Sequence, residues 1–175
     1  MPSHSSQHGF TLIELVIVIV LLGIVGAVAT AKFQDLSHTA RIAFIQGVQG
    51  SISSATTLVL AQAAIEGVDD GSIDYAGTSV DVRSGYPRGH WNRTWRYILI
   101  TSSSGAFTPA GSVCTGYPMC GVGNRGNIPG VSGTTGGRVI IIWLEGDRIN
   151  DNCFAYYYNR EDGTSPLIGT VISGC

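Results

Sequence analysis

The hydrophobic pattern changes sharply along the first third of the chain. An apolar run covers residues 10–31 and carries a single charge, Glu14, before the next charge at Lys32. As an α-helix this run would be about 33 Å long, which is enough to cross the hydrocarbon layer of a bilayer. A carboxylate is costly in such a segment and tends to mark a functional position there. We therefore interpret Glu14 as a residue that meets a charged partner.

Residues 32–66 show a helical periodicity of a different kind. Their apolar positions recur at steps of three and four, and the polar residues fall largely between them. The apolar positions are Ile45, Val48, Ile52, Ala55 and Val59. This spacing predicts an amphipathic helix that continues from the apolar run and ends near Glu66. Gly47 and Gly50 lower its helix propensity, which suggests close packing against their face.

The rest of the chain is expected to form loops and one small sheet. Residues 67–93 are rich in Gly, Asp, Ser and Tyr and predict a long connecting loop. Residues 102–137 are too polar for a core and predict a second loop. Aromatic and β-branched runs predict strands at 94–101, 138–144 and 153–158, and an edge strand at 167–172. Three or four antiparallel strands covering the amphipathic helix would give an α+β fold.

Length and cysteine content narrow the class of protein. A chain of 175 residues allows one compact domain besides the apolar segment. Its four cysteines all lie in the C-terminal third. In a chain that starts with an export-type segment, an even number of cysteines indicates two disulfides formed outside the cytosol. No C-x-x-C spacing occurs and no histidine follows His90, which argues against zinc, and three pairings stay open.

Catalytic motifs give no coherent pattern. The histidines are scattered and no serine lies in a G-x-S-x-G turn. The glycines from Gly121 to Gly126 spell G-x-G-x-x-G, but they follow no predicted strand and open no helix. The acidic residues near Asp70 lack the offsets of a calcium-binding loop. We therefore expect no enzymatic activity, no cofactor and no metal.

Four arginines form the one candidate ligand surface. Arg83, Arg88, Arg93 and Arg96 are interleaved with aromatic residues, among them Trp91. Arginines beside aromatic rings suit phosphates, stacked bases, sugars or anionic surfaces. The alternative, which we favour, is that the arginines pair with the preceding acidic stretch while the aromatic rings cap the core. The net charge of −2 also disfavours DNA as a partner.

The N-terminal segment resembles a known family. Gly9-Phe10-Thr11-Leu12-Ile13-Glu14-Leu15, followed by a long apolar helix, is similar to the N-terminus of type IV pilins and type II secretion pseudopilins. The resemblance implies that a prepilin peptidase cuts after Gly9 and N-methylates Phe10. It also implies that Glu14 pairs with the charged N-terminus of a neighbouring subunit, an attraction that low dielectric strengthens.

The same resemblance implies the organisation and role of the chain. Residues 1–9 would be a leader, residues 10–31 the transmembrane and assembly half of the helix, and residues 32–175 a globular pilin domain. The protein would be a structural subunit stored in the inner membrane. The assembly machinery would polymerise it with identical subunits into an extracellular pilus for adhesion, with motility as a further role. A glycan or other surface receptor would be its external partner.

A narrower resemblance concerns the mannose-sensitive haemagglutinin (MSHA) group of pilins. Val80-Asp81-Val82 and Gly85-Tyr86-Pro87 are similar to the corresponding region of those pilins. Pilins of this kind bracket a C-terminal loop with a disulfide, which implies the local pairs Cys114–Cys120 and Cys153–Cys175. The alternatives are a type II secretion pseudopilin, a DNA-binding minor pilin with exposed arginines, and an ordinary secreted protein cleaved near residue 30.

Overall fold

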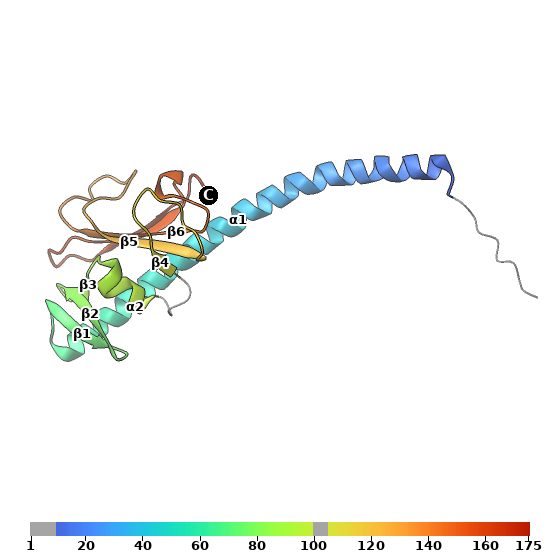
Figure 1. Cartoon of the computed structure of the whole chain (residues 1–175). Coiled ribbons are helices and arrows are strands. Elements are labelled where there is room, and N and C mark those ends of the chain that lie inside the picture. Colours follow the sequence, from blue (N-terminus) through green and yellow to red (C-terminus); the bar gives the residue numbers. More distant parts are fainter. Residues whose placement is uncertain (1–9, 100–104) are drawn as a thin grey trace, which may run out of the picture. The chain divides into compact units, whose positions relative to one another are not determined.

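The structure is a computed structural model that describes residues 10–99 and 105–175. The chain divides into two compact units, Met1–Ala40 and Arg41–Cys175. The predicted division after residue 31 was drawn from hydropathy alone and stays a prediction. The fold is α+β, with one long N-terminal helix and an antiparallel sheet, as the hydrophobic pattern predicts (Figure 1).

Helix α1 runs from Leu12 to Glu66, so the predicted helix and its end at Glu66 are confirmed. In the part that belongs to the first unit, large apolar side chains are exposed on every side. Within the part of the chain that the structure describes, α1 is the one helix long and apolar enough to cross a membrane, with a mean hydropathy of 3.0 in its most apolar window.

In the second unit, the predicted amphipathic face of α1 forms the core. Ile45, Ile52 and Val59 are fully buried, and the two other predicted positions are buried as well. The first two of these side chains share one apolar cluster with β6 and β7, and Val59 packs against the strands β1 and β2. The 3.6-residue period therefore identified the buried face of this segment correctly.

Gly47 and Gly50 behave differently from the prediction. A Cβ atom added at either glycine would meet no atom within 4 Å among the described residues. Both glycines line an open pocket together with Leu58 and Ile98. The expected close packing against this face is therefore wrong for the isolated chain.

Five strands form the larger sheet, in the order β4-β5-β6-β7-β8. They are β4 Gly105–Phe107, β5 Met119–Arg125, β6 Arg138–Leu144, β7 Phe154–Asn159 and β8 Leu167–Val171. The three strands predicted in the C-terminal part, including an edge strand, are confirmed. All neighbouring pairs are antiparallel except β4 and β5, which are parallel. The prediction of three or four strands, all antiparallel, is therefore wrong. Strands β4 and β5 bring the number to five, and these two strands pair in parallel.

Strand β6 lies at the centre of this sheet and is covered on both faces. Ile140 and Ile142 point into the cluster that contains α1, while Ile141 and Trp143 belong to a second cluster. Loop residues such as Ile128 close that second cluster. Burial on both faces explains why β6 reads as a continuous apolar run rather than an alternating one.

The prediction of a polar loop over residues 102–137 is wrong for the described residues. Strand β5 lies inside this range because its glycines permit close contact with another segment. A Cβ atom added at Gly121 would lie 2.1 Å from a ring carbon of Trp91. A Cβ atom added at Gly123 would lie 2.2 Å from the backbone nitrogen of Trp91. Glycine in a strand often marks such an approach, so composition alone misled the prediction.

The predicted loop over residues 67–93 is also wrong, because it holds a second sheet. Strands β1 Gly71–Tyr75, β2 Thr78–Arg83 and β3 Tyr86–Pro87 pair antiparallel in that order. Ala76 and Gly77 both have positive φ at the β1–β2 turn, as a type I′ hairpin requires. The polar residues of this stretch occupy the outer face, while Ile73, Val80 and Val82 face α1.

The strand predicted at 94–101 is replaced by a helical segment over its described part. A π-helical turn covers Trp91–Trp95 and the short helix α2 covers Arg96–Ile98; residues 100 and 101 lie outside the described residues. Trp91 and Trp95 are four residues apart and both buried, a spacing that suits a helix. The ring of Trp95 lies 4.4 Å, centroid to centroid, from that of Tyr157. Tertiary packing therefore overrides the strand propensity of this segment.

Two disulfides join the described cysteines. Cys114 pairs with Cys120, and Cys153 pairs with Cys175. The first closes the loop that precedes β5, and the second ties the last residue of the chain to the start of β7. These are the local pairs that the family resemblance implies.

Candidate assembly segment and ligand surface

Glu14 lies in the first turn of α1 and caps its own helix. The backbone nitrogen and the hydroxyl of Thr11 donate hydrogen bonds of 3.0 and 2.8 Å to Glu14 Oε2. The backbone nitrogen of Glu14 donates in return to Thr11 Oγ1 at 3.3 Å. This reciprocal arrangement is a capping box. Glu14 is therefore held in place within its own chain, and one carboxylate oxygen remains without a hydrogen bond to a described residue.

The residues around Glu14 offer a continuous apolar surface. Phe10 is 87% exposed, and the apolar side chains that follow it along α1 are exposed on all sides of the helix. A helix that is hydrophobic all round belongs in a membrane or in the core of a larger assembly. The predicted cleavage position, Gly9, lies outside the described residues.

The structure divides the four arginines of the candidate ligand surface into two pairs. Arg83 lies 3.5 Å from Asp70, and Arg88 Nε donates a 3.0 Å hydrogen bond to Glu161. Asp70 belongs to the acidic stretch that we expected to pair with the arginines, whereas Glu161 follows β7. Arg93 and Arg96 are exposed and form no ion pair with another described residue. Arg96 instead lies 5.4 Å from the ring centroid of Tyr97.

Trp91 does not belong to a ligand surface. Its side chain is only 1% exposed and packs against Gly121 of strand β5. An indole in that position cannot stack on a base or a sugar, so its inclusion among the ligand-binding residues is wrong. Its role is to fill the core, as the favoured alternative expected for the aromatic residues.

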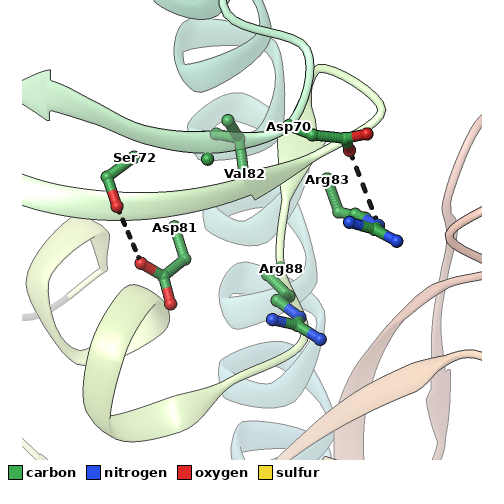
Figure 2. A pocket seen from close by; sticks show the side chains of 7 residues that line it. Asp70, Ser72, Asp81, Val82, Arg83 and Arg88 are labelled. Carbon is green, nitrogen blue, oxygen red and sulfur yellow. Dashed lines mark hydrogen bonds and ion pairs between the residues drawn. The ribbon is translucent and has the colours of Figure 1, made fainter.

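Arg83 and Arg88 together line a pocket of about 310 Å³ on the outer side of the β1–β2 hairpin. Figure 2 shows Asp70 and Arg83 on one side of this pocket, Ser72 and Asp81 on the other, and Arg88 below them. The hydroxyl of Ser72 donates a 3.1 Å hydrogen bond to Asp81 Oδ1. The sequence pointed to the two arginines, while the carboxylate partners could be identified only once the hairpin was known.

His90 follows this pocket along the chain and lies among charged groups. Burial lowers the pKa of His90 below its ordinary value, and the nearby Arg93 guanidinium lowers it further. Asp81 acts in the opposite direction, and Arg88 and Arg138 add to the lowering. Its Nδ1 atom is buried without a hydrogen-bond partner among the described residues. The folded chain therefore favours a neutral imidazole at this position.

A network around Arg41 was not anticipated from the sequence. Arg41 bonds to the carboxylate of Asp147 and donates a 3.0 Å hydrogen bond to the carbonyl oxygen of Cys175. Burial raises the pKa of Asp147, although the Arg41 guanidinium acts in the opposite direction. The partners are more than 100 residues away along the chain, so no local pattern could have revealed them.

The residues that the structure describes contain no group of three or more His, Cys, Asp or Glu side chains placed to hold a metal ion. The acidic residues of the β1–β2 region instead serve its turns. Asp70 accepts from the backbone nitrogen of Ser84 at 2.8 Å, and Asp74 accepts from that of Gly77 at 2.8 Å.

The N-terminal segment matches a motif that is known from other proteins. Residues 4–30 match the model of the prokaryotic N-terminal methylation motif. The chain is 43% identical over 63 residues to a fimbrial protein of Eikenella corrodens, a stretch that covers 36% of this chain and 40% of that protein. It is 44% identical over 55 residues to the major component of the type IV narrow pilus of Thermus thermophilus, covering 31% of this chain and 47% of that protein.

These similarities reach only part of each molecule. The matched region spans less than half the length of either relative. No solved structure matches the chain significantly. The chain thus carries the N-terminal methylation motif and is homologous to pilin proteins over about a third of its length.

Proposed function

We propose that the protein is a structural subunit of a type IV pilus. The observation that carries this proposal is the exposed apolar segment of α1, which combines the methylation motif with the single carboxylate of Glu14. The names of the two relatives, a fimbrial protein and a pilus major component, support the same role. The subunit acts by assembly and performs no catalysis.

The apolar segment explains two successive locations of the subunit. A prepilin peptidase cuts after Gly9 and methylates Phe10, while the helix holds the subunit in the inner membrane. The assembly machinery then transfers the subunit into a filament of identical copies. The bilayer and the filament core both keep the aliphatic side chains out of water, which is worth about 1.5–3 kcal/mol for each buried side chain relative to exposure. The filament emerges on the cell surface, where it serves attachment.

Glu14 determines how neighbouring subunits align in this proposal. An unpaired carboxylate in an apolar core is strongly unfavourable, so a packing that leaves it unpaired is disfavoured. The methylated amine of Phe10 on a neighbouring subunit supplies the positive charge. The capping box with Thr11 holds the carboxylate in a defined position before that contact forms.

We place the subunit nearer to the MSHA group than to other pilins. The support is the similarity in Val80-Asp81-Val82, which is part of β2, and in Gly85-Tyr86-Pro87, which covers the end of the turn and strand β3. A type II secretion pseudopilin would share the N-terminal segment, but both relatives are named for fimbriae or pili. The ion pairs of Arg83 and Arg88 count against a DNA-binding minor pilin.

The decisive experiment examines filaments sheared from the cell surface of the source bacterium. Negative-stain microscopy should show thin filaments, and mass spectrometry should find this chain starting at N-methylated Phe10. A chain starting at Thr30 or Lys32 would indicate a cleaved secretion signal and refute the proposal. Deletion of the gene should abolish these filaments and leave protein secretion intact. A secretion defect without loss of filaments would identify a pseudopilin instead.

A further inference from the structure

The pocket on the outer side of the β1–β2 hairpin, defined by Asp70, Ser72, Asp81, Arg83 and Arg88, has the features of a ligand site. Antiparallel pairing places Ser72 directly opposite Asp81. Asp81 and Arg83 are two residues apart on β2, so they lie on the same face of the sheet. Figure 2 shows these polar side chains together with Val82, which also lines the pocket.

The two guanidinium groups are oriented but not saturated. Arg88 uses its Nε atom for Glu161, and the Nε atom of Arg83 lies 3.5 Å from Asp70. The outer nitrogens of both groups form no hydrogen bond with another described residue. A guanidinium has five N–H donors in a rigid plane, so several donors remain for a ligand.

The carboxylates have the complementary chemistry. Asp81 accepts from Ser72 through Oδ1, which leaves its second oxygen for another donor. Asp70 is held by the backbone nitrogen of Ser84 and by Arg83, so it mainly fixes the position of that arginine. The pocket therefore offers donors on the arginine side and an acceptor on the Asp81 side.

The charges of the pocket leave no excess of positive charge. The lining contains two arginines and two aspartates, and Glu161 adds one further negative charge beside Arg88. A phosphate or a nucleic-acid backbone would gain little from such a balance, because binding of polyanions relies on unpaired positive charge. A neutral ligand with many hydroxyl groups fits better, since each hydroxyl can both donate and accept.

We propose that this pocket binds a neutral, hydroxyl-rich ligand of the size of a sugar ring. The volume of about 310 Å³ lies at the lower end of the range for small-molecule sites, about 300–1,000 Å³. The outer nitrogens of Arg83 and Arg88 donate to ring hydroxyls, and Asp81 accepts from a neighbouring hydroxyl. The site is formed within one subunit, so the proposal does not depend on filament assembly.

The test uses the full chain solubilised in detergent micelles and observed by saturation-transfer difference NMR. The probes are glucose, galactose and N-acetylglucosamine, with inorganic phosphate and a short DNA duplex as anionic comparisons. The pocket variants are Arg83→Gln and Asp81→Asn, and Ser72→Ala is a third variant at an exposed position. Arg93→Gln is the matched control, because Arg93 is exposed and does not line the pocket.

We expect at least one of the neutral sugars to bind the wild-type chain and the Arg93→Gln control equally well. Binding should weaken at least tenfold in Arg83→Gln and Asp81→Asn, with unchanged circular dichroism showing that the variants are folded. If one of these two variants does not fold, sugar binding by the other variant and by Ser72→Ala decides whether the pocket is the binding site. Binding of phosphate or DNA in preference to the sugars would overturn the proposal. No sugar binding, or binding that the pocket variants leave unchanged, would overturn it as well.

Discussion

Arg41 Nε donates a 3.0 Å hydrogen bond to the carbonyl oxygen of Cys175, which lies 134 positions further along the chain. The same guanidinium bonds to the carboxylate of Asp147. Cys175 is tied to β7 by its disulfide, and the backbone oxygen of Asp147 accepts from the backbone nitrogen of Cys114 at 2.9 Å. One side chain at the start of the second unit thus joins helix α1 to both disulfide-bonded segments.

The Arg41→Lys variant should destabilise the chain. An ammonium group retains the charge but cannot serve both partners with the planar geometry of a guanidinium. We expect a loss of about 1–2 kcal/mol in the free energy of unfolding, as for other hydrogen bonds that leave a partner unsatisfied. Denaturant unfolding of the full chain in detergent measures it. Arg93→Lys, at an exposed position, is the control, and equal stability of both variants would contradict the role of Arg41.

The two disulfides should differ in their contributions. The Cys153–Cys175 bridge spans 22 residues and the Cys114–Cys120 bridge spans 6. In the chain-entropy model these loops correspond to about 3 and about 2 kcal/mol respectively. Without this disulfide, Cys175 is no longer held beside Arg41, so the hydrogen bond from Arg41 to the backbone oxygen of residue 175 is weakened as well. We therefore expect the Cys153→Ser/Cys175→Ser double variant to have the lower Tm of the two double variants.

Thermal unfolding of the two double variants decides this point, after peptide mapping has established the pairs in the wild-type chain. A lower Tm for the Cys114→Ser/Cys120→Ser variant would show that local packing outweighs loop length. A map with exchanged partners would refute the pairing itself.

Gly121→Ala should be among the most damaging single-methyl additions to the sheet. The new Cβ atom would lie 2.1 Å from a ring carbon of Trp91, whose side chain is only 1% exposed. Overpacking of a core costs about 1–3 kcal/mol. Gly126→Ala is the matched control, because no atom lies within 4 Å of its added Cβ. A similar Tm for both variants would exclude the tight contact between Trp91 and β5.

The sequence predicted the elements in which hydrophobic periodicity and burial coincide. Helix α1 buries one stripe, so its spacing identified Ile45 and Ile52 as core residues. Strand β6 is buried on both faces, so its apolar run identified a central strand. In both cases the pattern within one segment carries enough information, because each segment buries its own side chains in a regular way.

The failures share a different physical cause. The strand β5 and the Trp91–Trp95 turn depend on each other, since Gly121 and Gly123 make room for Trp91. In the sequence, such a contact between distant segments is visible only as a high glycine content in one segment and as aromatic residues in the other. Each was therefore interpreted by its local propensity, as a loop and as a strand. The β1–β2 hairpin was missed because its turn, Ala76-Gly77, is not one of the common hairpin pairs.

The candidate sites show the same division. Glu14 is a candidate from the sequence because a lone charge in an apolar run is conspicuous, and its role in assembly stays a prediction. The arginine cluster was noticed, but only the structure separated Arg83 and Arg88 from Arg93 and Arg96. Their partners Asp70 and Glu161 come from two different parts of the chain, so pairing could be suspected but not assigned.

Because of His90, the free energy of unfolding should decrease as the pH is lowered. Its pKa is lowered in the folded state by burial and by Arg93, so below pH 6.5 the unfolded chain binds a proton that the folded chain does not. The contribution of His90 is therefore fully present above pH 6.5 and is lost as the pH falls towards the lowered pKa. We expect His90→Gln to reduce this pH dependence, measured by urea unfolding between pH 7 and pH 5. His38→Gln, at an exposed position, is the matched control for the loss of a histidine.

Glu14 has two roles that substitution can separate. Its carboxylate accepts hydrogen bonds from Thr11, and its charge is available for a neighbouring subunit. Glu14→Gln keeps a side-chain oxygen for the capping box but removes the charge, whereas Glu14→Ala removes both. If assembly depends on the charge, both variants should be cleaved after Gly9, stay in the membrane and form no filaments. Fractionation, mass spectrometry and microscopy of sheared material measure these outcomes.

The comparison between the two variants decides which role matters. Normal filaments from Glu14→Gln alone would show that capping of the helix, rather than pairing of charges, is the requirement. Normal filaments from Glu14→Ala would refute any role of this residue in assembly. We expect neither, because a helix cap contributes only about 0.5–2 kcal/mol and many other contacts can compensate for its loss. A positive N-terminus left without a partner in an apolar core has no such compensation, so the charge should be indispensable.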